Sequence, residues 1–112
     1  MTDIRDDRAE RRLEAREGGR VIGRIDYFVL DAVPAALVAV HTVVEPGHEG
    51  KGVAGALVGE FYAIAARQGV PVVPLCPYAA RWAGRHPDQA PEASPELVEK
   101  ARKQLAADPR ER

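Results

Sequence analysis

A glycine-rich loop between an apolar strand pattern and an amphipathic helix pattern constrains the fold of this chain most. The loop spans residues 45–52, and its Pro46-Gly47 step excludes both a helix and a strand at that point. Over residues 52–68 apolar residues recur every three or four positions, which predicts a helix that ends at Gly69. Residues 70–76 then predict a strand that ends on the single cysteine. The order strand, loop, helix and strand therefore organises the chain.

The start of the predicted helix is a candidate phosphate site. The first N–H groups of a helix have no internal partner, and the helix dipole places partial positive charge there. Gly50 and Gly52 would let a ligand approach this backbone closely, and Lys51 adds a mobile positive charge. Glycines before a helix also occur simply as turn residues, and spacing alone does not separate the two interpretations.

Three known phosphate-binding motifs can be compared with this loop. Residues 50–55 match the dinucleotide pattern G-x-G-x-x-G, but residues 70–77 lack the acidic residue that should follow it. A P-loop is excluded because Gly52 stands where a serine or threonine would hold magnesium. Residues 49–54 fit a third pattern, the acyl-CoA loop of the GNAT superfamily, Arg/Gln-x-x-Gly-x-Gly/Ala, except that Glu49 occupies its first position.

Residues 5–88 resemble the small single-domain GNAT-like N-acetyltransferases. Besides the loop, the resemblance rests on His41-Thr42 and on the segment 73–78 with its Pro-Leu-Cys-Pro element. One further position departs from the family, which often carries a glutamate where Val43 stands. If that glutamate takes part in catalysis in the family, its absence bears on activity here.

The resemblance implies an α+β, GNAT-like fold. It consists of an antiparallel three-stranded sheet followed by a helix, a splayed further strand and short C-terminal helices. The residue patterns place the three strands at 12–17, 21–30 and 36–44. Along the chain, we expect residues 1–9 to be flexible, 10–90 to form the N-acetyltransferase domain and 91–112 a C-terminal helical tail.

The resemblance also implies a function, an acetyl-CoA-dependent N-acetyltransferase that acts on an amine of a small molecule or a protein. The CoA pyrophosphate would lie on residues Glu49, Gly50, Lys51, Gly52, Val53 and Ala54. Backbone groups near Val43 and Val44 would hold the pantetheine arm, as a neighbouring strand would.

Two residues are candidates for the chemistry. Cys76 stands at the characteristic position of the family, where it would act as general acid or as nucleophile. A buried cysteine that only packs is the alternative. His41 is the candidate base because imidazole titrates near neutrality. A histidine that is simply part of the core is nearly as common. Glu45 is a second candidate base, acting through water, and Tyr78 is a second candidate acid.

Composition bears on which partners, compartment and metal the protein could have. A net charge of −1 offers no argument for nucleic acid or an anionic membrane as partner, and no apolar stretch is long enough to span a bilayer. The lone cysteine suits a reducing compartment, so we expect a cytoplasmic monomer or weak dimer. The histidines and the cysteine lack zinc-site spacing, so no metal is expected. Two other functions stay open: a non-catalytic acyl-CoA-binding module, suggested by Val43 and Glu49, and an interaction protein that uses the C-terminal helix.

Overall fold

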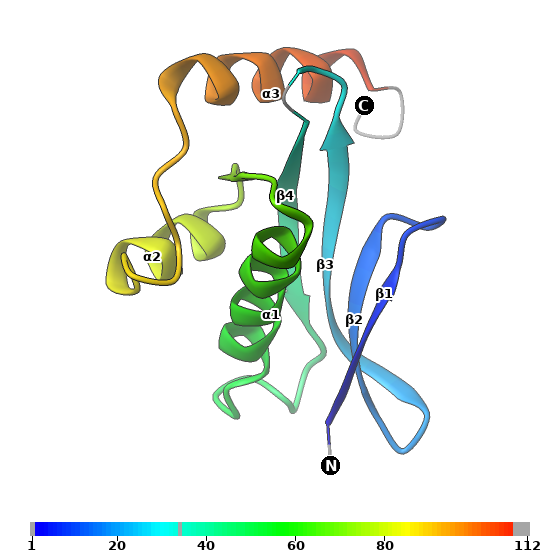
Figure 1. Ribbon diagram of the computed structural model, residues 1–112. Helices are drawn as coiled ribbons and strands as arrows, with labels where there is room; N and C mark the ends of the chain where they lie inside the picture. Colours follow the sequence, from blue (N-terminus) through cyan, green and yellow to red (C-terminus); the bar gives the residue numbers. More distant parts are fainter. Residues whose placement is uncertain (1, 34, 109–112) are drawn as a thin grey trace.

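The computed structural model describes residues 2–33 and 35–108, which form a five-stranded sheet with helices on both faces (Figure 1). The strands lie in the order β1-β2-β3-β4-β5; the first four are antiparallel and β5 runs parallel to β4. The elements in chain order are β1 (Asp3–Asp7), β2 (Arg12–Glu17), β3 (Arg20–Leu30), β4 (Ala36–Val44), α1 (Val53–Gln68), β5 (Val72–Pro74), α2 (Pro77–Arg85) and α3 (Pro95–Ala107).

The predicted strands at 12–17, 21–30 and 36–44 correspond to β2, β3 and β4. Gly18 and Gly19 join β2 to β3, and both have left-handed backbones, with φ of 59° and 79°. Two successive left-handed residues are what a tight hairpin with a right-handed twist requires. The predicted α+β order, three antiparallel strands followed by a helix and a further strand, is therefore confirmed.

Strand β1 differs from the expectation of a flexible segment over residues 1–9. It pairs along its whole length with β2, from Asp3 opposite Arg16 to Asp7 opposite Arg12. Ile4 packs on the core, and the hydroxyl of Tyr27 donates a hydrogen bond to Asp6. These contacts order a charged segment that has no apolar pattern of its own. Met1 and the last part of the predicted tail, residues 109–112, lie outside the described residues.

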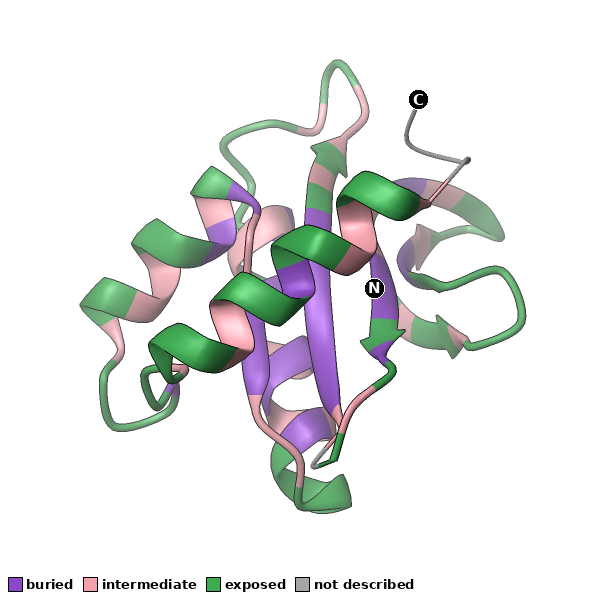
Figure 2. Ribbon diagram, turned by 90° about the horizontal axis from the view of Figure 1, so that it is seen from above, coloured by how far each residue is buried: buried purple, intermediate pink, exposed green. Residues whose placement is uncertain are grey.

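Helix α1 covers one face of the sheet, and Gly69 ends it with a φ of 70°, as expected. Its buried side chains, which include Phe61, join a core with residues of β2, β3 and β4 such as Leu13 and Ile25. Figure 2 shows this buried centre of the sheet, with exposed residues on the outer sides of the helices. Helix α2 packs beside α1, so the same face carries both helices.

Helix α3 covers the other face of the sheet over β3 and β5. Its Ala101 is fully buried in a second core with Phe28, Val38 and Val73. Ser94 caps the helix, as its side chain accepts a hydrogen bond from the Leu97 N–H at 3.2 Å. None of the described helices has both the length and the apolar character needed to cross a bilayer.

Strand β5 pairs with only the first half of β4. The paired residues run from Leu37 opposite Val72 to Ala39 opposite Pro74, whereas β4 continues to Val44. The two strands therefore part after Ala39, which confirms the predicted splay. Pro71 and Pro74 have no N–H to donate, which fits the place of β5 at the edge of the sheet.

Candidate functional site

The start of α1 opens onto a cavity of about 400 Å³. Gly52 precedes the helix with a φ of 78°, makes no side-chain cap, and the first turn contains no acidic residue. The N–H groups of this turn and the positive end of the helix dipole are thus not neutralised by the helix itself. The cavity is lined by Val44, His48, Glu49, Gly50, Gly52, Val53, Ala54, Gly55 and Tyr78, so five of the six predicted pyrophosphate residues lie on it.

Charged and polar side chains around this cavity have few partners. Lys51, the sixth predicted residue, is exposed and forms no ion pair within the described part of the chain. Glu49 is turned back to its own loop, where its Oε2 accepts a hydrogen bond from the Gly47 N–H at 3.0 Å. The Nδ1 atom of His48 is buried and has no hydrogen-bond partner among the described residues. The cavity therefore combines backbone donors with a histidine whose Nδ1 has no partner, and the exposed Lys51 lies next to it in the loop.

The unpaired edge of β4 forms one wall of the cavity at Val44. The Glu45 N–H bonds the Ile22 carbonyl of β3 at 2.8 Å, so odd-numbered residues at this end direct their backbone groups to β3. The backbone N–H and C=O groups of Thr42 and Val44 therefore point to the opposite edge of β4, which β5 leaves unpaired beyond Ala39. The structure thus brings Val44 to the open edge, but the backbone of the other predicted residue, Val43, faces β3. Thr42 was not predicted there.

A β-bulge in β4 decides which side chains face the splay. The pairing with β3 runs from Asp26 opposite His41 directly to Tyr27 opposite Ala39, so Val40 is the extra residue. Ala39 faces α1, and after the bulge Thr42 faces the same side, because its partner Ile25 belongs to the core under α1. The Cys76 thiol donates a hydrogen bond to the Thr42 hydroxyl, with 3.3 Å between sulfur and oxygen.

Cys76 lies where β4 and β5 part. Its N–H bonds the Ala39 carbonyl at 3.1 Å, and the residue directly precedes α2, with Pro77 at the first helical position. The side chain is 5% exposed and packs in the core under α1. A thiol held by a hydroxyl at this point can donate a proton to a sulfur in the splay or attack an acyl carbon there.

The structure does not bring His41 and Cys76 together. His41 lies opposite Asp26, and residues directly opposite in an antiparallel pair share a face. That face is the one away from α1, whereas Cys76 belongs to the face under α1. The sequence offers no signal for the bulge, and regular alternation along β4 would have placed His41 beside Ala39.

Tyr78 lies over the first turn of α1. A Cβ built on Gly55 would stand 3.5 Å from its hydroxyl, and one on Gly59 would stand 3.4 Å from the ring of Trp82. The two glycines thus let α2 approach α1, and Tyr78 becomes part of the cavity wall. Within the described residues no three His, Cys, Asp or Glu side chains are arranged to hold a metal ion.

Comparisons with known proteins agree with this geometry. A family model described as GCN5-related N-acetyl-transferase matches residues 12–92, which is more than half of the chain. No curated protein matches the sequence.

Two solved structures share the fold. One is the ribosomal-protein-alanine N-acetyltransferase of Brucella melitensis biovar Abortus 2308, with a TM-score of 0.56, 24% identity and coverage of 74% of this chain. The other is an aminoglycoside acetyltransferase from an uncultured soil metagenomic sample, with a TM-score of 0.50, 23% identity and coverage of 55% of this chain. This chain spans 62% and 43% of those two proteins, respectively.

Proposed function

Because this chain belongs to the GCN5-related N-acetyltransferase family, we propose that it transfers an acetyl group from acetyl-CoA to an amine. One observation carries the proposal: the uncapped start of α1 and the unpaired edge of β4 line the same cavity. The start of α1 suits a pyrophosphate, and the edge of β4 suits the amide groups of a pantetheine arm.

The pyrophosphate would accept hydrogen bonds from the first N–H groups of α1, at Val53, Ala54 and Gly55. Gly50 and Gly52 have φ of 79° and 78°, and a Cβ at either would meet nothing within 4 Å, so the space over the loop is open. The exposed side chain of Lys51 would add a positive charge next to the pyrophosphate. The pantetheine amides would pair with Thr42 and Val44 as a sixth strand would.

The thioester end of this arm would reach Cys76. A neutral amine attacks the carbonyl carbon, the C–N bond forms, and the C–S bond breaks as CoA leaves. The Cys76 thiol would give its proton to the departing sulfur, with the Thr42 hydroxyl orienting it. The attacking nitrogen would release one proton to water, and a proton from water would restore the thiol. In the alternative, Cys76 first takes the acetyl group and passes it to the amine.

Thermal melts test the binding half of the proposal. A ligand present at 100 times its dissociation constant stabilises a protein by about 2.7 kcal/mol, so CoA and acetyl-CoA should each raise the melting temperature. Product formation across a panel of amines then tests transfer. Absence of any stabilisation at millimolar CoA would refute the proposal at its first step.

Mass spectrometry separates the two roles of Cys76. Incubation with acetyl-CoA alone should leave the thiol unmodified if Cys76 is the general acid. A mass increase of one acetyl group on Cys76 that disappears when amine is added would establish the covalent route instead.

A non-catalytic acyl-CoA-binding module is a second candidate, favoured by the position of His41 on the sheet face away from Cys76. A binder of this kind would melt at a higher temperature with acetyl-CoA but form no product with any amine of the panel. Melts and turnover together therefore distinguish the two functions.

A further inference from the structure

The cavity at the start of α1 has two side walls. Val44, on the unpaired edge of β4, belongs to one wall, and Tyr78 of α2 belongs to the other. The proposed function, on which this inference rests, places the pantetheine arm of CoA along the β4 wall and the pyrophosphate at the start of α1. The wall at Tyr78 is then left for the nucleotide end of CoA, which is attached to the other side of the pyrophosphate.

Two arginines of α2, Arg81 and Arg85, lie on the same side of that helix as Tyr78. They follow Tyr78 by three and seven residues, and residues at these spacings share one side of a helix, with ~5–6 Å between the Cβ atoms of residues three apart. Long side chains of a helix also lean towards its N-terminus, so both guanidinium groups lean towards the end of α2 at which Tyr78 stands. Arg81 and Arg85 are therefore placed beside the wall of the cavity.

The contacts between α2 and α1 show which way this side of α2 faces. A Cβ built on Gly59 would meet the ring of Trp82, whereas the hydroxyl of Tyr78 lies nearest to Gly55, one turn closer to the start of α1. At ~100° per residue, Trp82 and Tyr78 are followed around α2 by the two arginines in the same sense of rotation. The arginine side of α2 thus faces the direction in which α1 begins.

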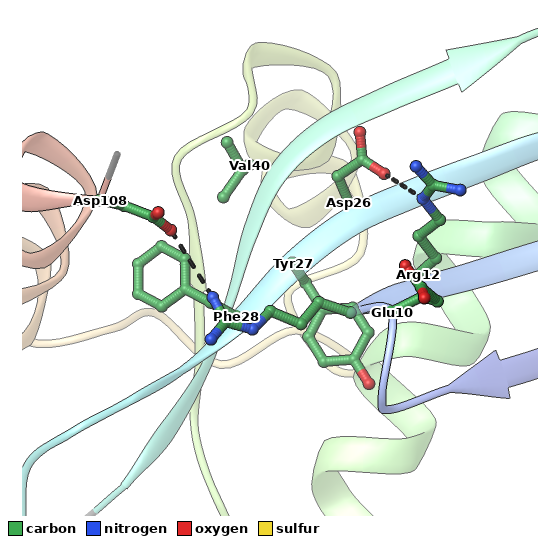
Figure 3. A pocket seen from close by; sticks show the side chains of 8 residues that line it. Glu10, Arg12, Asp26, Tyr27, Phe28, Val40 and Asp108 are labelled. Carbon is green, nitrogen blue, oxygen red and sulfur yellow. Dashed lines mark ion pairs between the residues drawn. The ribbon is translucent and has the colours of Figure 1, made fainter. Parts of the chain in front are cut away.

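Arg81 and Arg85 have all their donors available. Both side chains are exposed, and neither forms an ion pair or hydrogen bond within the described part of the chain. Most other described arginines are paired with a carboxylate. In the hollow on the sheet face away from α1, for example, Arg12 lies 3.6 Å from Asp26, and a second arginine lies 3.6 Å from Asp108 (Figure 3).

The surroundings of the two arginines favour an anion. Helix α2 contains no acidic residue, and the first turn of α1 contains none either. Among the residues that line the cavity, Glu49 is the one carboxylate, and it accepts a hydrogen bond from the Gly47 N–H of its own loop. The exposed Lys51 adds a further positive charge at the same end of α1.

We propose that Arg81 and Arg85 bind the 3′-phosphate of CoA, so that the protein distinguishes acyl donors that carry this phosphate from donors that lack it. The 3′-phosphate belongs to the same ribose whose 5′ end carries the pyrophosphate, and one sugar ring therefore separates it from the start of α1. Guanidinium groups bind phosphate through paired, charge-assisted hydrogen bonds, which an isolated lysine does not offer.

Calorimetric titration with CoA and with dephospho-CoA, which lacks only the 3′-phosphate, tests the proposal. The dissociation constant of dephospho-CoA should be at least fivefold higher than that of CoA at 50 mM salt. This ratio should shrink as the salt concentration rises, because salt screens the charges of exposed side chains. Equal dissociation constants at 50 mM salt would overturn the proposal.

Variants locate the phosphate. Arg81→Gln and Arg85→Gln should each weaken the binding of CoA at least threefold and change the binding of dephospho-CoA less than twofold, and the double variant should bind both ligands equally. Arg102→Gln is the matched control, since Arg102 is an exposed arginine of α3, on the other face of the sheet, with no ion pair among the described residues. A double variant that still prefers CoA as wild type does would refute the assignment.

The same titrations, combined with product formation, keep the two proposals apart. If an amine is acetylated but CoA and dephospho-CoA bind equally, the arginine site falls and the proposed function stands. If the arginines account for a preference for CoA but no amine is acetylated, the site stands and acetyl transfer falls. If neither ligand binds, both proposals fall.

Discussion

Replacing Gly52 with alanine tests the phosphate role of the loop against a control from the same helix. Gly52 and Gly69 flank α1 at its two ends and have similar left-handed backbones, with φ of 78° and 70°. A Cβ at either position would meet nothing within 4 Å. The two substitutions therefore impose the same strain, but only one of them lies at the proposed pyrophosphate site.

The structure sets the expected size of both effects. A left-handed backbone costs a residue with a Cβ ~1–2 kcal/mol, and alanine regains ~0.4–1 kcal/mol by restricting the unfolded chain. Each variant should thus lose about 1 kcal/mol of folding free energy, a fall in melting temperature of about 4–8 °C. CoA affinity should fall at least tenfold in Gly52→Ala, or about 1.4 kcal/mol, and stay within twofold in Gly69→Ala.

Calorimetric titration with CoA, run on both variants after their melting temperatures are known, gives the answer. Equal stability losses with unequal CoA affinities are the expected result. If Gly52→Ala binds CoA as tightly as Gly69→Ala does, the backbone at the start of α1 is not the pyrophosphate site, and the reasoning from the uncapped helix fails.

Four further predictions concern single residues. Cys76→Ala should lower turnover more than tenfold while CoA affinity changes less than threefold; wild-type turnover would leave the cysteine a packing residue. Tyr62→Phe should keep or raise the melting temperature, because the buried hydroxyl has no partner among the described residues, and a loss above about 1 kcal/mol would reveal one. Burial raises the pKa of Tyr62 to about 12. The tyrosine of the unfolded chain, with a pKa near ~10, therefore ionises at lower pH than the folded one. The ionisation of Tyr62 should leave the free energy of unfolding unchanged below pH 10 and lower it as pH rises towards 12. Denaturant titrations at several pH values can follow this loss. Gly23→Ala should destabilise by about 1–3 kcal/mol, because its Cβ would stand 2.9 Å from a methyl of Val53, whereas Gly59→Ala should be neutral or stabilising by urea denaturation.

The sequence predicted those elements whose ends carry specific backbone chemistry. Helix α1 was expected over residues 52–68 and spans Val53–Gln68, because glycine at both ends marks left-handed backbones. The cap of α3 at Ser94 was predictable for a similar reason, since serine before proline fits both the cap and the first helical position.

Two features depend on tertiary pairing and left no sequence signal. Strand β1 is ordered by β2 and by the hydroxyl of Tyr27, whereas its own residues are mostly charged. The bulge at Val40 arises from the pairing of β4 with β3, and the apolar run before it in β4 gives no sign of its position. For this reason the sequence indicated Cys76 at the end of the strand after the helix but offered His41, and not Thr42, as the other candidate on β4.

The bulge protects the surroundings of the thiol from a change in register. If β4 kept all its residues but paired without the bulge, regular alternation from Ala39 onward would bring the imidazole of His41 to the thiol of Cys76 and turn the hydroxyl of Thr42 to the opposite face. A titratable group would then replace a neutral hydrogen-bonding group beside the sulfur. A chain without residue 40, by contrast, could keep both pairings with no bulge and leave Thr42 beside Cys76. Homologues that lack this one residue are therefore expected to keep the same chemistry at the thiol.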